Sequence, residues 1–362
     1  MKSRDIIGFF FNWWDYLKCK ISGVSLILHG SYYTTNVGDR TLAIVLKNEL
    51  AKQGLALVIT SRFIMNPPVK NIVVGGGGII HNINDKNIKL RTHFLNKQRN
   101  VYFVGIGAHE INKFSRSEKE QLKKMSNANY ISLRDKNSFF ELTNFLDSEQ
   151  KKFQLGQCPS WLFSDDKKYK DISLRNFFIF LFYNIRYSKY TYSQKRCVRG
   201  KDCRIGLNLR YSNFDKIERR RIAIQKIANL SKNNQIIFIP FYYEDLRFYV
   251  NELSRLNIKC LKLQNPIKTF NSVKKMDKMI ATRYHSFIFS LLNNKPVMIL
   301  GYHQKVIALA EEMNMKYFDM IDDKNNDFVF NKPNKSHIGN KINKAREERD
   351  KLSKFLKKLM HK

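Results

Sequence analysis

The stretch Met279–Lys305, MIATRYHSFIFSLLNNKPVMILGYHQK, decides the fold prediction. Its apolar run Met279–Ala281 predicts the end of a strand, and Phe287–Leu292 is apolar at helical density. Pro296–Leu300, which follows two asparagines, predicts a second buried strand. A strand, a helix and a second strand in this order form the repeating unit of a parallel sheet.

Arg283 and His285 directly follow the first of these strands. In open α/β sheets, the ligand crevice lies outside the carboxyl ends of the strands. A guanidinium, a titratable imidazole and the positive end of a helix together suit an anion. The alternative is structural, with Arg283 stabilising a turn and His285 packed in the core. These residues alone leave both interpretations open.

Length and composition limit the function classes. A chain of 362 residues predicts two domains. Lys and Arg number 65 against 31 Asp and Glu, so the net charge is +34. Such an excess predicts an acidic partner, namely nucleic acid, anionic lipid or a charged substrate. A generally Lys- and Asn-rich composition is the alternative explanation for part of the excess. The five cysteines form no paired CxxC motifs, so we expect a reducing cytoplasm.

Two apolar runs raise the question of membrane contact. Ile6–Trp14 and Phe177–Tyr183 are far shorter than the roughly 20 residues that span a bilayer. The first run also lacks a cleavage site for a signal peptide. However, Trp13, Trp14 and Tyr16 lie near lysines, a combination that suits a membrane interface. We therefore expect a cytoplasmic protein and hypothesise peripheral binding at the inner face of the plasma membrane; the alternative is a helix packed on the first domain.

A loop after the first strand, Val24–Leu28, holds candidate substrate contacts. It reads GSYYTTNVGD and includes Asn36, Gly38 and Asp39. Gly38 permits a tight turn, and Asp39 can cap the helix that follows. Capping alone explains Asp39, whereas a substrate contact would explain the whole loop.

Four glycines, Gly75–Gly78, follow the strand predicted at Asn71–Val74. Such a run lets a ligand approach backbone N–H groups closely. It matches neither common nucleotide-binding glycine motif, and a close backbone crossing is the structural alternative. His81 and His109 lie just beyond predicted strands and are further candidates for the same edge.

The order of strands, helices and basic segments divides the chain into five parts. Alternating strands and helices in two of them predict parallel sheets with helices on both faces. The basic aromatic segment between these two suits a membrane surface or a polyanion, or it is a disordered loop with one docked helix. The tail predicts a basic amphipathic helix that packs across the domains or rests on a membrane. The parts are an aromatic lead (1–23), a first domain (24–165), the linker or insertion (166–204), a second domain (205–331) and the tail (332–362).

Several segments resemble the polysaccharide pyruvyl transferase family. They are TTNVGDRTLA, VVGGGGII, FVGIGAHEI, ISLRDKNS, IGLNLR, MIATRYHSFIFSLLNNKPV and GYHQK, in family order over roughly residues 24–310. The resemblance implies two Rossmann-like domains facing a cleft, similar to the B-type glycosyltransferases. The segment around His109 departs from the family pattern, which usually has proline after the glycines.

The resemblance also implies the activity. Members of the family move the enolpyruvyl unit of phosphoenolpyruvate onto two hydroxyls of one sugar, which gives a cyclic pyruvate ketal. By resemblance, Arg283 and His285 are the catalytic pair, and Arg210, Tyr284 and Ser286 join them in binding phosphoenolpyruvate. Arginine suits carboxylate and phosphate, and histidine suits proton transfer near neutral pH. We expect no cofactor and no metal, with phosphoenolpyruvate as donor substrate.

The acceptor is expected on the N-terminal domain, at Asn36, Gly38, Asp39 and the glycines Gly76, Gly77 and Gly78. Acceptors in the family are glycans on lipid diphosphate carriers or simpler glycosides, made for capsule or exopolysaccharide. One rival is a nucleotide-sugar glycosyltransferase of the same layout, but no acidic ribose-binding signature is visible. A polyanion or nucleic-acid binder is the other rival; it leaves Arg283 and His285 unexplained, so we expect no nucleic-acid partner.

Overall fold

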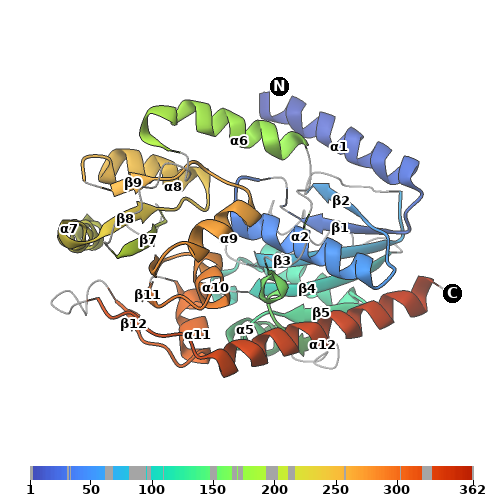
Figure 1. Cartoon of the computed structure of the whole chain (residues 1–362). Coiled ribbons are helices and arrows are strands. Elements are labelled where there is room, and N and C mark those ends of the chain that lie inside the picture. Colours follow the sequence, from blue (N-terminus) through green and yellow to red (C-terminus); the bar gives the residue numbers. More distant parts are fainter. Residues whose placement is uncertain are drawn as a thin grey trace. The chain divides into compact units, whose positions relative to one another are not determined.

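A computed structural model describes two compact units. One comprises Met1–Tyr33, Asp39–Leu162 and Lys341–Lys362, and the other comprises Thr34–Gly38 and Phe163–Asn340. Each unit is an α/β structure with its own parallel sheet (Figure 1). The described residues are 3–30, 32, 34–61, 68–80, 95, 99–108, 110–146, 153–164, 169, 174–192, 203–210, 217–256, 258–301, 303–319 and 328–360.

The first unit contains a six-stranded sheet in the order β2-β1-β3-β4-β5-β6, and all its strand pairs are parallel. This is the flavodoxin-like order, extended by one strand. Its strands are β1 (Leu26–Gly30), β2 (Val58–Ser61), β3 (Asn71–Ile80), β4 (Asn100–Ala108), β5 (Tyr130–Leu133) and β6 (Phe153–Leu155). Its helices are α1 (Ser3–Ser22), α2 (Val37–Lys52), α4 (Arg116–Lys123), α5 (Lys136–Leu146) and α12 (Lys335–Met360), whose first residues belong to the second unit.

The four glycines Gly75–Gly78 lie inside β3, and the strand continues through them. A Cβ atom at Gly75 would lie 2.4 Å from Leu46, and one at Gly76 would lie 2.5 Å from Leu42. Both leucines belong to α2. The prediction that the strand ends before the glycines is therefore wrong, because the glycines make room for the packed helix while the strand continues; Gly76 and Gly77 also have φ angles of +68° and +88°.

The C-terminal helix α12 packs on the first sheet through buried polar groups. The Glu348 carboxylate accepts hydrogen bonds from the Ser132 hydroxyl and from the Gln157 backbone N–H. Beside it, Arg349 donates to the nearly fully buried Glu49 of α2 at 2.5 Å. This helix, whose existence the sequence predicts, is thus an integral part of the first unit from Lys341 onward.

The second unit contains a parallel sheet in the order β12-β11-β10-β7-β8-β9. Renumbered within the unit, this is the Rossmann order, and the strand order reverses between β7 and β10. Its strands are β7 (Arg204–Asn208), β8 (Gln235–Phe238), β9 (Ile258–Cys260), β10 (Lys278–Ala281), β11 (Val297–Leu300) and β12 (Tyr317–Phe318). Its helices are α6 (Leu174–Arg186), α7 (Ile217–Asn233), α8 (Tyr243–Phe248), α9 (Pro266–Lys274), α10 (Tyr284–Leu292) and α11 (Gln304–Glu312).

The predicted fold class, two doubly wound α/β units with a C-terminal helix, is confirmed. The central strands are buried on both faces, as expected for parallel sheets covered by helices. The segment predicted as a linker or insertion contributes α6, and the structure does not describe residues 193–202. None of the helices within the described ranges has the length and apolar character needed to cross a membrane.

Candidate active site

The candidate site lies in the second unit at the point where the strand order reverses. Strands β7 and β10 are neighbours there, with Asn208 paired in register with Ala281. Arg210 follows β7, and Arg283 and His285 follow β10, so these groups share the carboxyl edge of the sheet. This switch point is where open α/β sheets bind ligands.

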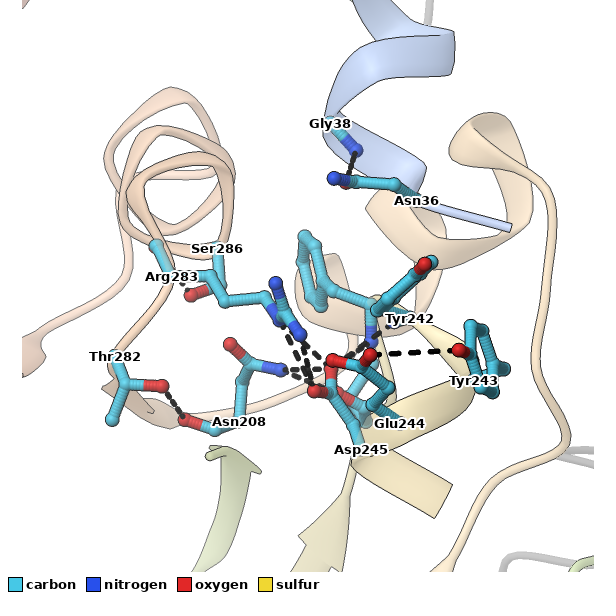
Figure 2. A network of polar contacts seen from close by, with 12 residues as sticks. Asn36, Gly38, Asn208, Tyr242, Tyr243, Glu244, Asp245, Thr282, Arg283 and Ser286 are labelled. Carbon is cyan, nitrogen blue, oxygen red and sulfur yellow. Dashed lines mark hydrogen bonds and ion pairs between the residues drawn. The ribbon is translucent and has the colours of Figure 1, made fainter. Parts of the chain in front are cut away.

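Asp245 is the centre of the polar network in Figure 2. Its carboxylate is fully buried and accepts from the backbone N–H groups of Phe241 and Tyr242 at 2.9 and 3.1 Å. Arg283 donates to it through Nε at 2.9 Å and through Nη2 at 2.5 Å. A buried carboxylate with this set of donors holds the guanidinium in one plane and one position.

The Arg283 side chain is 12% exposed and lies between Asp245 and an aromatic ring. Its guanidinium carbon is 5.5 Å from the centre of the Tyr242 ring. Burial raises the pKa of the Tyr242 hydroxyl, and Arg283 opposes that rise only in part. The tyrosine is therefore neutral at physiological pH and offers Arg283 a ring face.

Two hydrogen bonds and a cluster of aromatic rings hold the start of α10 in place. Ser286 Oγ donates to the Arg283 carbonyl at 2.7 Å, and Thr282 Oγ1 donates to the Asn208 carbonyl at 3.1 Å. One turn further on, Phe289 packs among Phe163, Phe270 and Phe241, with ring centres 5.1 to 5.7 Å apart. Because this core is rigid, the first backbone N–H groups of α10 keep a constant direction.

His285 lies against part of the predicted loop Gly30–Asp39, namely the residues Thr34–Gly38 that belong to the second unit. The Val37 backbone N–H donates to the Phe241 carbonyl at 2.8 Å, and Asn36 Oδ1 accepts from the Gly38 N–H at 3.0 Å. A Cβ atom at Gly38 would lie only 2.0 Å from His285 Nδ1. Glycine is therefore required at position 38 if the imidazole is to keep its place.

The remaining predicted residues divide between the units. Tyr284 is buried edge-to-face against His285 at 5.4 Å, and half-buried Arg210 lies just beyond β7. Asp39 belongs to the first unit, where its Oδ1 would lie 3.4 Å from a Cβ atom at Gly77. Gly76 and Gly78 lie in the same strand as Gly77, and contact of these residues with an acceptor stays a prediction. His81 and His109 lie outside the described residues.

Sequence reasoning missed Asp245 and Asn208. Asp245 follows β8 in the run FYYEDL, and its partner Arg283 is 38 residues away, so no local pattern links them. A charged residue just past a buried strand is the one signal that pointed to it. Asn208 is fully buried, and its Nδ2 donates to the Ile239 carbonyl at 3.1 Å. Within the described part of the chain, no group of three or more His, Cys, Asp or Glu residues could hold a metal ion.

Solved structures of other proteins are similar to this chain in fold. S. aureus MnaA, in a co-structure with UDP, is 10% identical over 87% of this chain and 86% of its own, with a TM-score of 0.52. A Listeria monocytogenes protein assigned as a UDP-N-acetylglucosamine 2-epimerase is 11% identical over 91% and 90%, with a TM-score of 0.51. These identities show a shared fold alone, the B-type glycosyltransferase layout expected from the sequence. No curated protein matches the chain.

The family is shown by a match to its sequence profile. The model described as "Polysaccharide pyruvyl transferase" matches residues 9–304, which include the whole of the site described above. The chain belongs to the polysaccharide pyruvyl transferase family. It is therefore a pyruvyltransferase that acts in polysaccharide synthesis.

Proposed function

We propose that the enzyme transfers the pyruvyl unit of phosphoenolpyruvate onto two hydroxyls of one sugar and forms a cyclic ketal. The observation that carries the proposal is the fixed Arg283, held by Asp245 beside His285 at the β7–β10 switch point. Phosphoenolpyruvate has a carboxylate and a phosphate, and a planar guanidinium can bind either group through two hydrogen bonds.

The reaction balances without a redox step. The bond between C2 of phosphoenolpyruvate and its phosphate-bearing oxygen breaks, and two bonds from C2 to sugar oxygens form. C3 gains one proton and becomes a methyl group, while the other hydroxyl proton leaves with the phosphate. The site must therefore move protons and bind a departing anion, and the transfer as written draws on no cofactor.

His285 is the group proposed to move the protons. Imidazole is the side chain that titrates near neutral pH, so it can accept a hydroxyl proton and supply one to C3. The ring lies so close to Gly38 that no Cβ atom fits there, and Tyr284 packs edge-to-face against it, so its orientation is restricted. A restricted ring suits proton transfer because the donor and acceptor atoms must come within hydrogen-bond distance.

Asp245 is proposed as a positioning residue for Arg283. Because the two charges offset one another, Arg283 contributes directed hydrogen bonds more than net positive charge. Arg210 then supplies the additional charge for the donor anions, and the backbone N–H groups at Tyr284, His285 and Ser286 face the phosphate at the start of α10. Arg210 follows the strand next to the one that Arg283 follows, which is consistent with a shared anion.

The acceptor is proposed to be a glycan, either on a lipid diphosphate carrier or as a simpler glycoside. Asp39 can accept a hydrogen bond from a sugar hydroxyl, and Asn36 can donate or accept one. In the first unit, Asp39 lies at the carboxyl edge between β1 and β3, where that sheet reverses its strand order. A lipid-linked acceptor would place the reaction at a membrane surface.

Calorimetry with phosphoenolpyruvate tests the proposal. We expect wild type and Arg204→Ala to bind phosphoenolpyruvate and Arg283→Ala to bind at least about a hundredfold more weakly, the loss typical of a charge-assisted bidentate contact. Arg204 is the matched control because it lies at the opposite end of β7, paired with Asp277. A wild-type protein that binds UDP-sugars and not phosphoenolpyruvate would overturn the proposal in favour of a glycosyltransferase.

A further inference from the structure

Helix α6 has two apolar faces, and one of them packs on the second unit. Phe180 joins the core of that unit, and Tyr183 and Tyr187 pack against the same core. Asn184 exchanges hydrogen bonds with the backbone of Leu263 at 2.9 and 3.0 Å. These four positions recur at helical spacing and form the inner face, so α6 is firmly docked over residues 180–187.

The other face of α6 carries large apolar side chains that are exposed. Leu181, Phe182 and Ile185 are 41%, 58% and 64% exposed, and they lie on the side opposite the inner face. Burial of the inner face already accounts for the docking of the helix. The outer face therefore calls for a second explanation, because neighbouring exposed apolar side chains mark an interaction surface.

Two cations, Arg186 and Lys189, accompany this outer face. Arg186 and Lys189 are both exposed, and each lies over the ring of the tyrosine that follows it, at 5.8 and 4.8 Å. The sequence has no Asp or Glu from Ile172 to Lys201. The basic residues in that interval are Arg175, Arg186, Lys189, Lys195, Arg196, Arg199 and Lys201.

We propose that the outer face of α6 binds the surface of an anionic lipid bilayer. Apolar side chains beside aromatic rings and cations, with no acidic residue among them, match the chemistry of a bilayer interface with negatively charged headgroups. A protein partner would need a complementary acidic apolar surface, whereas an anionic bilayer presents both properties at once. The proposed surface comprises Leu181, Phe182, Ile185 and Arg186 of α6 and Lys189 of the turn that follows it.

The first unit independently repeats this chemistry in α1. Trp13 and Trp14 are each 54% exposed, and Ile21 is 82% exposed. The Lys18 ammonium lies 5.7 Å from the centre of the Trp14 ring. Tryptophan with lysine is the usual pairing at the headgroup level of a membrane, so α1 is a second contact of the same kind.

The inner face of α6 connects this surface to the site. The Tyr183 ring stacks on Tyr243 at 4.7 Å, and Tyr243 contacts Tyr242 at 4.5 Å. Tyr242 is the ring that lies against Arg283. Three successive ring contacts, through Tyr183, Tyr243 and Tyr242, thus link α6 to the proposed donor site. Delivery of a lipid-linked acceptor by this surface rests on the proposed function, whereas bilayer binding itself does not.

Sedimentation with phosphatidylglycerol vesicles tests the proposal. We expect the full chain to sediment with these vesicles at low salt, to be released as salt rises, and not to sediment with phosphatidylcholine vesicles. Phe182→Ser with Ile185→Ser should lower the partition coefficient about tenfold or more. Relative to wild type, Arg186→Glu with Lys189→Glu should lower the partition coefficient by roughly fivefold for each cation removed.

Two variants serve as matched controls. Phe140 of α5 is 58% exposed, the same as Phe182, so Phe140→Ser should leave sedimentation unchanged. Arg116 of α4 has a side chain that is 95% exposed, so Arg116→Glu controls for the loss of surface charge. Phosphoenolpyruvate binding should be unchanged in all these variants. That measurement separates the two proposals. If the wild type does not bind phosphoenolpyruvate, the proposed function is wrong, whereas sedimentation with vesicles still supports bilayer binding.

Three results would overturn the proposal. One is a wild-type protein that fails to sediment with phosphatidylglycerol vesicles at low salt. Another is equal loss of sedimentation in the Phe182→Ser, Ile185→Ser pair and in Phe140→Ser. The third is a wild-type oligomer that the Phe182→Ser, Ile185→Ser pair converts to a monomer, which would assign the face to a second copy of the chain.

Discussion

Replacement of Gly38 by alanine should separate activity from stability. The added Cβ atom would lie 2.0 Å from His285 Nδ1 and 2.6 Å from Cγ. Ordinary contact begins at 3.4 Å, so the two groups must move apart by 3.4 − 2.0 = 1.4 Å. A misplacement of about 1 Å in a reacting group can cost about a hundredfold in rate, and we expect Gly38→Ala to lower kcat by that order.

The same substitution should not weaken the fold. Gly38 lies in the first turn of α2, and alanine is favoured over glycine in helices by up to about 1 kcal/mol. The alanine N–H can still donate to Asn36 Oδ1, so the start of the helix keeps its cap. Displacement of the imidazole by the new Cβ atom offsets this gain, so we expect the unfolding free energy to change by about 1 kcal/mol or less while activity falls.

Kinetics and urea denaturation on four proteins check this reasoning. They are wild type, Gly38→Ala, His285→Ala and the double variant. If Gly38 acts through His285, the alanine at 38 should cost little once the imidazole is gone. Gly339→Ala is the matched control, because Gly339 is helical with open space around its Cβ position. Full activity in Gly38→Ala, or a large further loss in the double variant, would refute the proposed coupling.

Three further variants test the other buried polar groups and glycines. Asp245→Asn removes the buried charge that holds Arg283. It should lower the unfolding free energy in urea denaturation by about 3 kcal/mol or more and weaken phosphoenolpyruvate binding in calorimetry. No change in either measurement would contradict the positioning role of Asp245. Burial raises the pKa of the Glu348 carboxyl to about 8, above its ordinary 4.5, so the folded state holds the proton more tightly than the unfolded state. The unfolding free energy should fall by up to about 1.4 kcal/mol per unit as pH rises from about 4.5 to about 8, and Glu348→Gln should flatten that slope. Gly105→Ala should destabilise the first unit by roughly 1–3 kcal/mol without affecting donor binding, since Gly105 has a φ of +57° and its Cβ would lie 2.8 Å from the Gln157 carbonyl oxygen.

Much of the fold follows from hydrophobic runs in the sequence. The strand expected at Pro296–Leu300 is present as β11 (Val297–Leu300), and the whole strand–helix–strand unit from Met279 to Leu300 is present. These elements are predictable because a buried parallel strand has a short continuous apolar run and the helix after it has its own periodicity. The sequence predicted a strand that ends before Gly75–Gly78, whereas the strand continues through the glycines packed against α2, and only the tertiary structure supplies that packing.

Some features of the site could also be predicted from the sequence, and others could not. The positions of Arg283 and His285 after a strand and at the start of a helix could be predicted, because that is a local pattern. Asp245 could not be predicted, because it meets Arg283 only when β8 and β10 lie on either side of β7 in one sheet. The contact between Gly38 and His285 joins residues that are far apart in the sequence. Pairings of this kind depend on topology, which a single sequence does not specify.

The most direct test of pyruvyl transfer is detection of the product. The enzyme would be incubated in deuterated water with phosphoenolpyruvate labelled with carbon-13 and a panel of glycosides and lipid-diphosphate-linked glycans, and the products examined by NMR. We predict a labelled ketal whose methyl group carries one solvent deuterium, formed by wild type and formed far more slowly by His285→Ala. Consumption of a nucleotide sugar with no ketal from phosphoenolpyruvate would contradict the account.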